Sequence, residues 1–582
     1  MRILGISCFY HDAAACLYGD EGPVAAAEEE RFTRKKHDSS FPARSIDWVL
    51  QHAGITAHDL DHVVFYEKPV LKFGRILEMT VDAYPEGVGH FTPAMQSWLR
   101  EKLWIADRIR KIGWAGEVLY GQHHLSHAAS AYYPSSFDEA AVVTLDGVGE
   151  RATSTIGRGN GLELELLEEI DFPHSLGLLY SVFTAFLGFE VNEGEYKLMG
   201  LAAYGRPRYA DQVRRLVLVA DDRSYRLDLR YFAFSRRPAA WSALFEDAFG
   251  RPFPPGSLEG EIDQRAADIA ASIQEVTEEA ILAVATRARD LTGSRRLCFG
   301  GGVAQNVLAN GRILRERLFD QMYVPSAPGD SGGALGAAAY VTHAVLRLPR
   351  SRAPHAYLGP AYTSDDVRRA VAESGLPSRE VDRPQLVREA ARMIAGGRIV
   401  GWFQGRMEFG PRALGARSIL ADARDPAMKE KVNARIKYRE RFRPFAPSVV
   451  RDDVDRYFED LPMSPFMSFA ARARPEVRDV IPAVIHADGT SRIQTVGPDD
   501  QPVYYELLQE LGRLTGHRVV LNTSFNLRGE PIVATPADAL ECFVRTSLDA
   551  LFLENLIVEP RPMEVAERKG ERATTVRTIA VS

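Results

Sequence analysis

Glycine-rich turns that directly follow short apolar segments recur through the first half of this chain. The first closes the apolar segment ILGIS, and the others are LDGVGE (145–150), FGGGVAQN (299–306) and GDSGGALGA (329–337). The last two run into predicted helices, where unpaired backbone N–H groups and the helix dipole favour anions. Glycine suits such turns because a side chain would keep the backbone away from phosphate oxygens. A single turn of this kind is a weak signal, but the set predicts an α/β fold with phosphate-binding loops.

The order of these turns resembles that of the actin-like, sugar-kinase and Hsp70 ATPases. An N-terminal strand and turn, a central strand ending in Asp-Gly and a late GGG turn are the layout of that superfamily. Its members wrap a nucleotide between two ribonuclease-H-like halves, so the resemblance implies an N-terminal domain of this kind. Alternating apolar residues at 2–8, 13–18 and 23–29 predict an opening β-meander.

A change in the sequence pattern divides the chain into two predicted domains. The proline-rich stretch RLPRSRAPHAYLGP (347–360) separates them. We predict one domain over 1–355, a smaller α/β domain over 380–560 and a charged surface extension over 561–582. Helices are expected over 44–53, 125–132 and 261–292, and strands over 62–67 and 140–149.

Charge and composition exclude several classes of protein. Acidic residues number 78 and basic residues 71, and the net charge of -7 argues against a general nucleic-acid or membrane-surface binder. No apolar run approaches the ~18 residues of a membrane-spanning helix, and the N-terminal segment lacks the features of a secretory leader. The four cysteines, at 8, 16, 298 and 542, form no CxxC pair, which argues against disulfides or structural zinc. We therefore expect a cytoplasmic protein without nucleic-acid or membrane partners, with Cys8 and Cys16 on buried strands.

The segment GQHHLSHAASAYY (121–133) opens a predicted helix with two histidines four residues apart. His123 and His127 would project from one face of this helix, where they can share a metal ion. Asp146 and Asp330 lie at the mouths of glycine-rich turns, and their carboxylates can complete the ligand set. These four residues are the predicted site for zinc or iron. The alternative is a chance histidine pair on a surface helix, and His124 is expected to have a structural or supporting role.

Two arginine-rich segments of the second half look like fixed loops rather than solvated charge. The segment QGRMEFGPRALGAR (404–417) places Arg406, Arg412 and Arg417 among apolar residues and glycines, and VNARIKYRERFRPFAPS (432–448) ends in a proline-bounded turn. Guanidinium groups on such loops match phosphate oxygens bidentately, which predicts a small, highly anionic ligand. Salt bridging is the alternative for any single arginine, and RNA binding is a weaker alternative because no extended basic face can be shown.

Motifs along nearly the whole chain resemble the O-carbamoyltransferases of the NodU/CmcH type. The first half carries GISCFYHDAAACL, EEERFTRKKHD, HHLSHAASAYYPS, LDGVGE, KLMGLAAYG, FGGGVAQN and PGDSGGALG. The second half carries MEFGPRALGARSIL, RFRPFAPSV, DGTSRIQTV and NTSFNLRGEPIV. The resemblance extends to about residue 560, and the arginine loop together with HxxxH is its most specific part. The family makes carbamate esters on antibiotics, toxins and signalling glycans.

The resemblance implies a two-site, ATP-dependent reaction. The N-terminal domain is similar to the threonylcarbamoyl-transfer proteins of tRNA modification, and the C-terminal domain to the threonylcarbamoyl-adenylate synthases. In the family the C-terminal domain makes carbamoyl adenylate from carbamoyl phosphate and ATP, with Mg accompanying ATP. The adenylate passes internally to the N-terminal domain, where an acceptor hydroxyl attacks it and AMP leaves. Adenylation supplies a stabilised leaving group, and internal passage protects the intermediate from water.

The resemblance also implies roles for individual residues. His11 falls where a general base would deprotonate the acceptor hydroxyl. His123, His127, Asp146 and Asp330 fall where the family holds its transfer-site metal, with iron reported for similar members. Carbamoyl phosphate and ATP are expected to contact Arg412, Lys437, Arg443, Arg492, Asn522 and Ser524. The adenylate is expected to contact Lys36, Gly147, Lys197, Gly200, Gly301, Gly302 and Asn306.

Position 9 departs from the family pattern. Some members carry an aspartate two residues before the histidine, where this chain has Phe9. The implied acceptor is therefore a hydroxyl compound less cationic than an aminoglycoside, among small natural products or glycans. Two other functions stay open: a tRNA threonylcarbamoyl-type transferase and an actin-like nucleotide switch without catalysis. The presence of a second domain argues against the tRNA-modifying transferase. A nucleotide switch would leave the arginine loop without a ligand. A homodimer is a candidate assembly.

Overall fold

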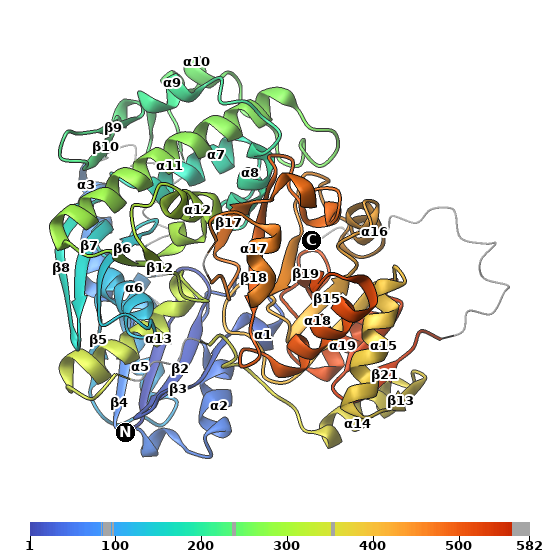
Figure 1. The fold of residues 1–582 in the computed structure, drawn as a ribbon. Helices are drawn as coiled ribbons and strands as arrows, with labels where there is room; N and C mark the ends of the chain where they lie inside the picture. Colours follow the sequence, from blue (N-terminus) through green and yellow to red (C-terminus); the bar gives the residue numbers. More distant parts are fainter. Residues whose placement is uncertain are drawn as a thin grey trace, which may run out of the picture.

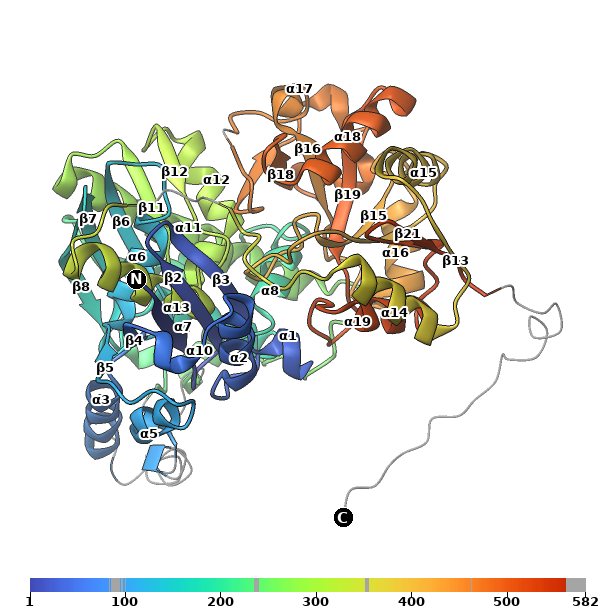
Figure 2. The same cartoon turned by 90° about the horizontal axis from the view of Figure 1, so that it is seen from below.

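A computed structural model of the protein has two lobes that lie side by side (Figures 1 and 2). It describes residues 1–82, 84, 95, 98–99, 101–234, 240–350, 355–461 and 463–561. The N-terminal lobe, blue to yellow-green in Figure 1, holds two five-stranded sheets, and the C-terminal lobe, yellow to red, holds one nine-stranded sheet. The extension predicted over 561–582 lies, after residue 561, outside the described residues.

The first sheet has the strand order β3-β2-β1-β4-β5. Its strands are β1 (Ile3–Ser7), β2 (Ala14–Gly19), β3 (Gly22–Glu28), β4 (His62–Phe65) and β5 (Val118–Tyr120). β1 pairs antiparallel with β2, which pairs antiparallel with β3, whereas β4 runs parallel to β1 and β5 parallel to β4. The predicted opening β-meander is therefore confirmed.

The second sheet repeats this topology in the order β12-β11-β6-β7-β8. β6, β7 and β8 form an antiparallel meander, and β11 and β12 extend it in parallel from β6. Two such sheets are the ribonuclease-H-like halves of the actin-like and sugar-kinase-like folds, so the predicted fold class is confirmed. The strands are β6 (Glu139–Leu145), β7 (Ala152–Asn160), β8 (Glu163–Asp171), β11 (Arg296–Gly300) and β12 (Gln321–Tyr323).

Two helices, α6 (His123–Tyr132) and α13 (Asp330–Tyr340), pack against each other between the two sheets. Their contact is unusually close because a Cβ on Gly336 would lie 1.9 Å from the carbonyl oxygen of Ser126. A Cβ on Gly5, in β1, would lie 1.9 Å from the carbonyl oxygen of Ala334 in α13. Gly5 is therefore needed for packing, and the prediction that its segment forms a phosphate-binding loop is wrong.

The longest helix is α11 (Gln264–Thr292), close to the predicted range of 261–292. Its first turn is capped by Asp263, whose side chain accepts a hydrogen bond from the N–H of Ala266, and it ends at Gly293 in the left-handed region. The other α-helices among the described residues of the N-terminal lobe are α1 (Glu30–Thr33), α2 (Ala43–His52), α3 (Pro69–Asp82), α5 (Ile105–Arg110), α7 (Leu176–Phe186), α8 (Glu195–Ala202), α9 (Ala210–Arg214), α10 (Ala243–Phe249) and α12 (Val307–Arg315). A small hairpin pairs β9 (Val217–Val219) with β10 (Tyr225–Leu227).

The C-terminal sheet has the order β13-β21-β20-β14-β15-β19-β16-β18-β17. Its strands are β13 (Ser378–Glu380), β14 (Val400–Phe403), β15 (Arg417–Ala421), β16 (Ala446–Val450), β17 (Phe469–Arg472), β18 (Thr490–Val496), β19 (Val519–Ser524), β20 (Ala550–Leu553) and β21 (Leu556–Val558). The C-terminal domain is predicted to begin at residue 380. Because β13 pairs with β21, the sheet also includes Ser378 and Arg379, which precede that position.

Helices cover both faces of the C-terminal sheet. Consecutive residues of β15 point to opposite faces: Leu420 packs in the core beneath α15 and α18, and Ile419 in the core shared with α14 and α19. These helices are α14 (Ser364–Ser374), α15 (Arg383–Ala395), α18 (Pro502–Thr515) and α19 (Pro536–Val544), and the short α16 (Met428–Val432) and α17 (Val454–Tyr457) lie in the connections.

All four cysteines are free and buried. Cys16 lies on β2 as predicted, whereas Cys8 follows the end of β1 instead of lying on it. Among the helices of the described residues, none combines the length and apolar character needed to cross a membrane.

Candidate active site

A cavity of about 880 Å³ lies between the two lobes and is lined by both. The predicted site residues that line it from the N-terminal lobe are His11, Lys36, Asp146, Gly147, Gly200, Gly302, Asn306 and Asp330. Those from the C-terminal lobe are Arg412, Arg443, Arg492, Asn522 and Ser524. His123, His127, Lys197, Gly301 and Lys437 lie outside the cavity lining.

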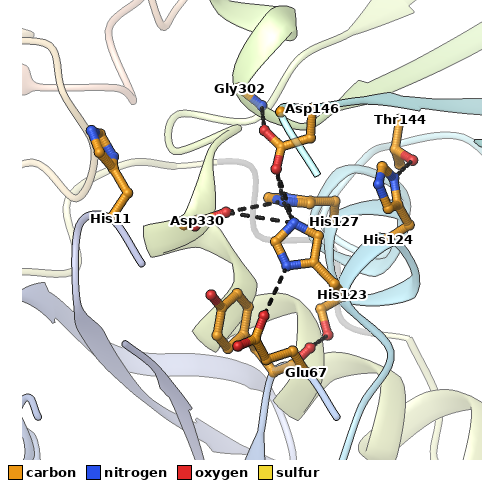
Figure 3. A network of polar contacts seen from close by, with 12 residues as sticks. His11, Glu67, His123, His124, His127, Thr144, Asp146, Gly302 and Asp330 are labelled. Carbon is orange, nitrogen blue, oxygen red and sulfur yellow. Dashed lines mark hydrogen bonds and ion pairs between the residues drawn. The ribbon is translucent and has the colours of Figure 1, made fainter. Parts of the chain in front are cut away.

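The four predicted metal ligands converge beside this cavity (Figure 3). The Nε2 atoms of His123 and His127 lie 3.1 Å apart. His123 Nε2 lies 2.9 Å from Asp146 Oδ2, and His127 Nε2 lies 3.3 Å from Asp330 Oδ1. The ligand atoms of all four residues lie within 4.8 Å of one another, so one ion can contact the whole set.

Local structure explains how these side chains meet. His123 and His127 are one helical turn apart on α6, so both face the same side. The carboxylate of Glu150 accepts hydrogen bonds of 3.1 Å from the backbone N–H of His123, which holds the start of that helix. Asp146 follows the last residue of β6, and Asp330 is the first residue of α13.

Unpaired atoms show whether these residues suit a metal ion. Both carboxylate oxygens of Asp330 are buried and make no hydrogen bond to a described residue, and Oδ1 lies 3.3 and 3.7 Å from the Nε2 atoms of His127 and His123. The facing Nε2 atoms of the two histidines cannot both carry a proton at 3.1 Å, whereas both can direct lone pairs at one cation. Two imidazoles and two carboxylates form a donor set that suits zinc or iron. The four residues therefore fit the predicted ion.

Buried polar groups surround this cluster. Glu67 Oε2 lies 3.5 Å from His123 Nδ1 and accepts a hydrogen bond of 2.7 Å from Lys72 Nζ, an arrangement that orients the His123 ring. His124 points away from the cluster (Figure 3), with Nδ1 2.6 Å from Thr144 Oγ1. Burial, reinforced by the neighbouring histidines, lowers the pKa of His124 to about 3, so its role is structural.

His11 lies apart from the cluster, on the side of Asp330 (Figure 3). Its Nδ1 is 2.7 Å from Asp12 Oδ2, and its Nε2 is 3.0 Å from the carbonyl oxygen of Asn192. His37 approaches the other oxygen of Asp12 with Nδ1 at 2.7 Å and stacks on the His11 ring at 4.7 Å. Burial alone would lower the pKa of His11, but the hydrogen bond and charge of Asp12 outweigh it and raise the pKa to about 10.

Arginines of the C-terminal lobe form the opposite part of the lining: Arg412, Arg439, Arg443 and Arg492. The side chains of Arg412 and Arg492 have neither a hydrogen bond nor an ion pair with any described residue. Burial lowers the pKa of Arg412 to about 10, and burial together with the neighbouring arginines lowers the pKa of Arg492. Such crowded, unpaired guanidinium groups favour a ligand with several negative charges.

Two other arginines of the 404–417 segment serve the fold instead. The guanidinium of Arg417 is fully buried, stacks on the Phe403 ring at 3.5 Å and donates to the carbonyl oxygen of Pro360 at 3.0 Å. Arg406 donates to the carbonyl oxygen of Leu358 at 2.6 Å. Including these two in a phosphate-binding set is therefore wrong, because neither lines the cavity.

Lys437 is buried behind the cavity wall. Its Nζ donates to the side-chain oxygen of Asn526 at 2.7 Å and to the carbonyl oxygen of Ser524 at 2.5 Å. The lysine thus holds the loop that presents Ser524 to the cavity. Asn522 Nδ2 donates to the carbonyl oxygen of Ala413 at 3.2 Å, which connects the same strand to the arginine loop.

The residues expected to contact the adenylate divide into two groups. Lys36, Gly147, Gly200, Gly302 and Asn306 line the cavity, and Lys36 pairs with Glu193. Gly301 has φ +87 and packs against β6, where a Cβ would lie 2.2 Å from the carbonyl oxygen of Leu145, so its role is in packing. Lys197 joins the two lobes through an ion pair of 3.2 Å with Glu440.

Several lining residues were not among the predicted site residues. Arg439 lies in the basic run already noted, so its alternation with Lys437 and Arg443 was a usable signal. Asp12 directly follows the predicted base His11, and this adjacency was also a usable signal that Asp12 belongs to the site. The contact from Asn192 comes from a backbone carbonyl, for which side-chain identity carries no signal.

Comparison with known proteins places the chain in a family. Residues 2–339 match the family described as "Carbamoyltransferase N-terminus", and residues 391–560 match "Carbamoyltransferase C-terminus". The chain belongs to the carbamoyltransferase family. It is 46% identical to the uncharacterized protein sll1178 of Synechocystis sp. over 96% of each chain, and 36% identical to the nodulation protein NolNO of Sinorhizobium fredii over 95% of this chain and 79% of that protein.

The resemblance noted from the motifs is thus confirmed, and the protein is a transferase of carbamoyl groups. A solved activator of 2-hydroxyisocaproyl-CoA dehydratase from Clostridium difficile aligns with 58% of this chain and 94% of its own, at 14% identity and a TM-score of 0.30. The fold assignment of the carbamoyltransferase rests on its sheet topology instead. Phe9 of the carbamoyltransferase packs against the core of the first sheet and does not line the cavity.

Proposed function

We propose that this carbamoyltransferase makes carbamoyl adenylate from carbamoyl phosphate and ATP and transfers the carbamoyl group to a hydroxyl of a small-molecule acceptor. The observation that supports it most strongly is that the arginines and the His11 region line one and the same cavity. An adenylate formed beside the arginines can reach the N-terminal wall without entering bulk water.

The arginines suit the first half-reaction because both substrates are polyanions. Arg412, Arg443 and Arg492 would bind phosphate oxygens and offset the repulsion between carbamoyl phosphate and Mg-ATP. For the atoms to balance, carbamoyl phosphate first loses phosphate to water. An oxygen of the resulting carbamate then displaces pyrophosphate from ATP. The products are carbamoyl adenylate, phosphate and pyrophosphate.

The N-terminal wall suits the second half-reaction. The acceptor oxygen forms a bond to the carbamoyl carbon, the bond to AMP breaks, and His11 takes the hydroxyl proton. Zinc or iron held by His123, His127, Asp146 and Asp330 would supply positive charge near the leaving phosphate. Lys36 lines the same part of the cavity and is expected to contact the adenylate.

Two variants separate the half-reactions. Arg412→Ala should lower carbamoyl-phosphate-dependent release of pyrophosphate by about 100-fold or more, because a phosphate-binding charge is lost. His11→Ala should keep that release and lower carbamate-ester formation by about 100-fold, because the general base is lost. Pyrophosphate and AMP are measured separately, with a panel of hydroxyl natural products and glycans as acceptors.

Exposed residues of the same type provide matched controls. Arg441 lies two positions from Arg443 but is exposed and does not line the cavity, and His58 is also exposed. Arg441→Ala and His58→Ala should leave both rates unchanged. If Arg412→Ala and His11→Ala lose the same half-reaction, the two-site reaction is wrong. Turnover without carbamoyl phosphate would also contradict it.

A further inference from the structure

Both ring nitrogens of His11 face hydrogen-bond acceptors. Nδ1 lies 2.7 Å from a carboxylate oxygen of Asp12, and Nε2 lies 3.0 Å from the backbone carbonyl oxygen of Asn192. A carboxylate and a carbonyl have no proton to donate, so both nitrogens must carry hydrogen to make these bonds. In this arrangement His11 is an imidazolium and has no lone pair with which to accept a proton.

The groups around His11 reinforce this state. The Asp12 carboxylate is shared with His37, whose ring stacks on His11 at 4.7 Å. The charge of Asp330 also favours a charged His11 ring. The titratable and charged groups of the cavity wall on the N-terminal side include Tyr10, Asp12, Glu28, Glu30, Arg31, Lys36, His37, Asp146, Glu193, Glu195 and Asp330.

The Asn192 carbonyl belongs to the loop of residues 187–194, which joins α7 to α8. Two contacts tie this loop to the N-terminal segment: the Asn192 carbonyl on His11 and the Glu193 carboxylate on Lys36 Nζ. Asn192 is exposed and has φ +68, a conformation that glycine and asparagine adopt more readily than other residues. Val191, Asn192 and Glu193 form part of the cavity wall, so a ligand in the cavity meets this loop directly.

We propose that the 187–194 loop is a latch that occupies Nε2 of His11 through the Asn192 carbonyl and must withdraw before this nitrogen can accept the proton of an acceptor hydroxyl. This inference rests on the proposed function, in which His11 is the general base. When the Asn192 carbonyl leaves, Nε2 holds its proton about tenfold more weakly and can release it to water, while the Nδ1 proton stays in its hydrogen bond to Asp12. The freed lone pair then takes the hydroxyl proton as the carbamoyl–oxygen bond forms and AMP leaves. Asn192 is therefore a positioning residue, acting through His11.

The protonation state of His11 can be measured without any turnover. In protein labelled with ring-¹⁵N histidine, the signals that disappear in His11→Gln identify His11. At pH 7.5 the two ring nitrogens of His11 should both report attached protons in the free wild-type protein. A neutral His11 with one bare nitrogen at this pH would overturn the proposal.

Substitutions at Asn192 test the loop itself. Asn192→Val disfavours φ +68 and should move the carbonyl, so that His11 binds its proton about tenfold or more weakly, as expected for loss of a hydrogen bond from a charged donor. Asn192→Gly keeps the backbone conformation available and should leave proton binding by His11 unchanged. Equal proton binding in the two variants would overturn the proposal.

A second variant covers the case in which Asn192→Val does not fold. Glu193→Gln breaks the ion pair with Lys36 and should also weaken proton binding by His11, because the loop loses its other tie. Unchanged proton binding in Glu193→Gln, with a folded protein by circular dichroism, would contradict the latch. If proton binding by His11 changes as expected but no carbamate ester forms with any acceptor, the proposed function is wrong, and only the effect of the loop on His11 stands.

Discussion

The carboxylate of Asp146 accepts a hydrogen bond of 2.9 Å from the backbone N–H of Gly302. This contact joins the turn after β6 to the turn after β11, across 156 positions of the chain. The other carboxylate oxygen of Asp146 lies 2.9 Å from Nε2 of His123. The late glycine turn therefore orients a predicted metal ligand, besides lining the cavity.

Gly302→Ala should weaken metal binding. A Cβ at this position would lie 2.8 Å from Asp146 Oδ1, so the carboxylate must shift away from the cluster. We expect about a tenfold loss of affinity for zinc or iron, measured by competition with a chelator. Gly260→Ala, at an exposed glycine with no neighbour within 4 Å of a Cβ, is the control. Equal affinity in the two variants would show that Asp146 does not depend on this turn.

Asp330→Asn should remove a ligand charge from the cluster. Both oxygens of Asp330 are buried without hydrogen-bond partners among the described residues, which is expected of a carboxylate that contacts an ion. The metal content of the purified protein, measured by mass spectrometry, should fall from about one equivalent to well below half. Asp320→Asn, at an exposed aspartate paired with Arg295, should keep its metal. Full metal occupancy in Asp330→Asn would contradict the proposed ligand set.

Arg492→Met should stabilise the free protein and weaken anion binding. Arg492 lies in a group of arginines without a partner of its own among the described residues, so its charge is unfavourable until an anion binds. We expect the free energy of unfolding to rise by about 1 kcal/mol without ligand. The increase in Tm that inorganic phosphate produces should be smaller than in wild type.

The exposed Arg513 provides the comparison for that experiment. Its side chain is 79% exposed, so Arg513→Met should change neither the stability nor the phosphate effect. A destabilised Arg492→Met protein that keeps the full phosphate effect would mean that this arginine supports the fold and not the ligand.

Asp12→Asn should destabilise the protein in a pH-dependent way. The pKa of His11 rises from its ordinary 6.5 to about 10. The contribution of the Asp12–His11 pair to the free energy of unfolding is therefore fully present below pH 6.5 and is lost as the pH rises through about 10. The pKa of Asp12 is lowered below its ordinary 3.8, because the hydrogen bonds and charges of His11 and His37 outweigh burial. The stability that this shift contributes is present above pH 3.8 and is lost at lower pH.

The loss of stability in Asp12→Asn should therefore be about 1–3 kcal/mol near pH 6 and smaller near pH 10. Denaturant titrations at pH 6, 8 and 10 measure it. Asp221→Asn, at an exposed aspartate, should show no such trend. A loss that stays constant from pH 6 to pH 10 would mean that the Asp12–His11 pair does not titrate as the structure implies.

Much of the fold followed from local sequence patterns. The opening meander, the long helix near 261–292 and the helix that carries HxxxH were all predicted and are confirmed. The prediction for Gly5 was wrong, because a glycine needed for close helix packing and one needed for phosphate look the same in sequence. The domain boundaries and the roles of the site residues stay predictions.

The sequence alone determined the strand-and-turn order and the pairing of His123 with His127 on one helix face. Both depend on residues a few positions apart, whose geometry the backbone period dictates. Only the tertiary structure decided that Arg412 and Arg492 line the cavity while Arg406 and Arg417 bind backbone carbonyls. It also placed the Asn192 carbonyl on His11, 181 positions away. These environments consist of backbone atoms that folding brings together from distant parts of the chain. The atoms around a guanidinium or an imidazole determine its protonation state and its hydrogen bonds.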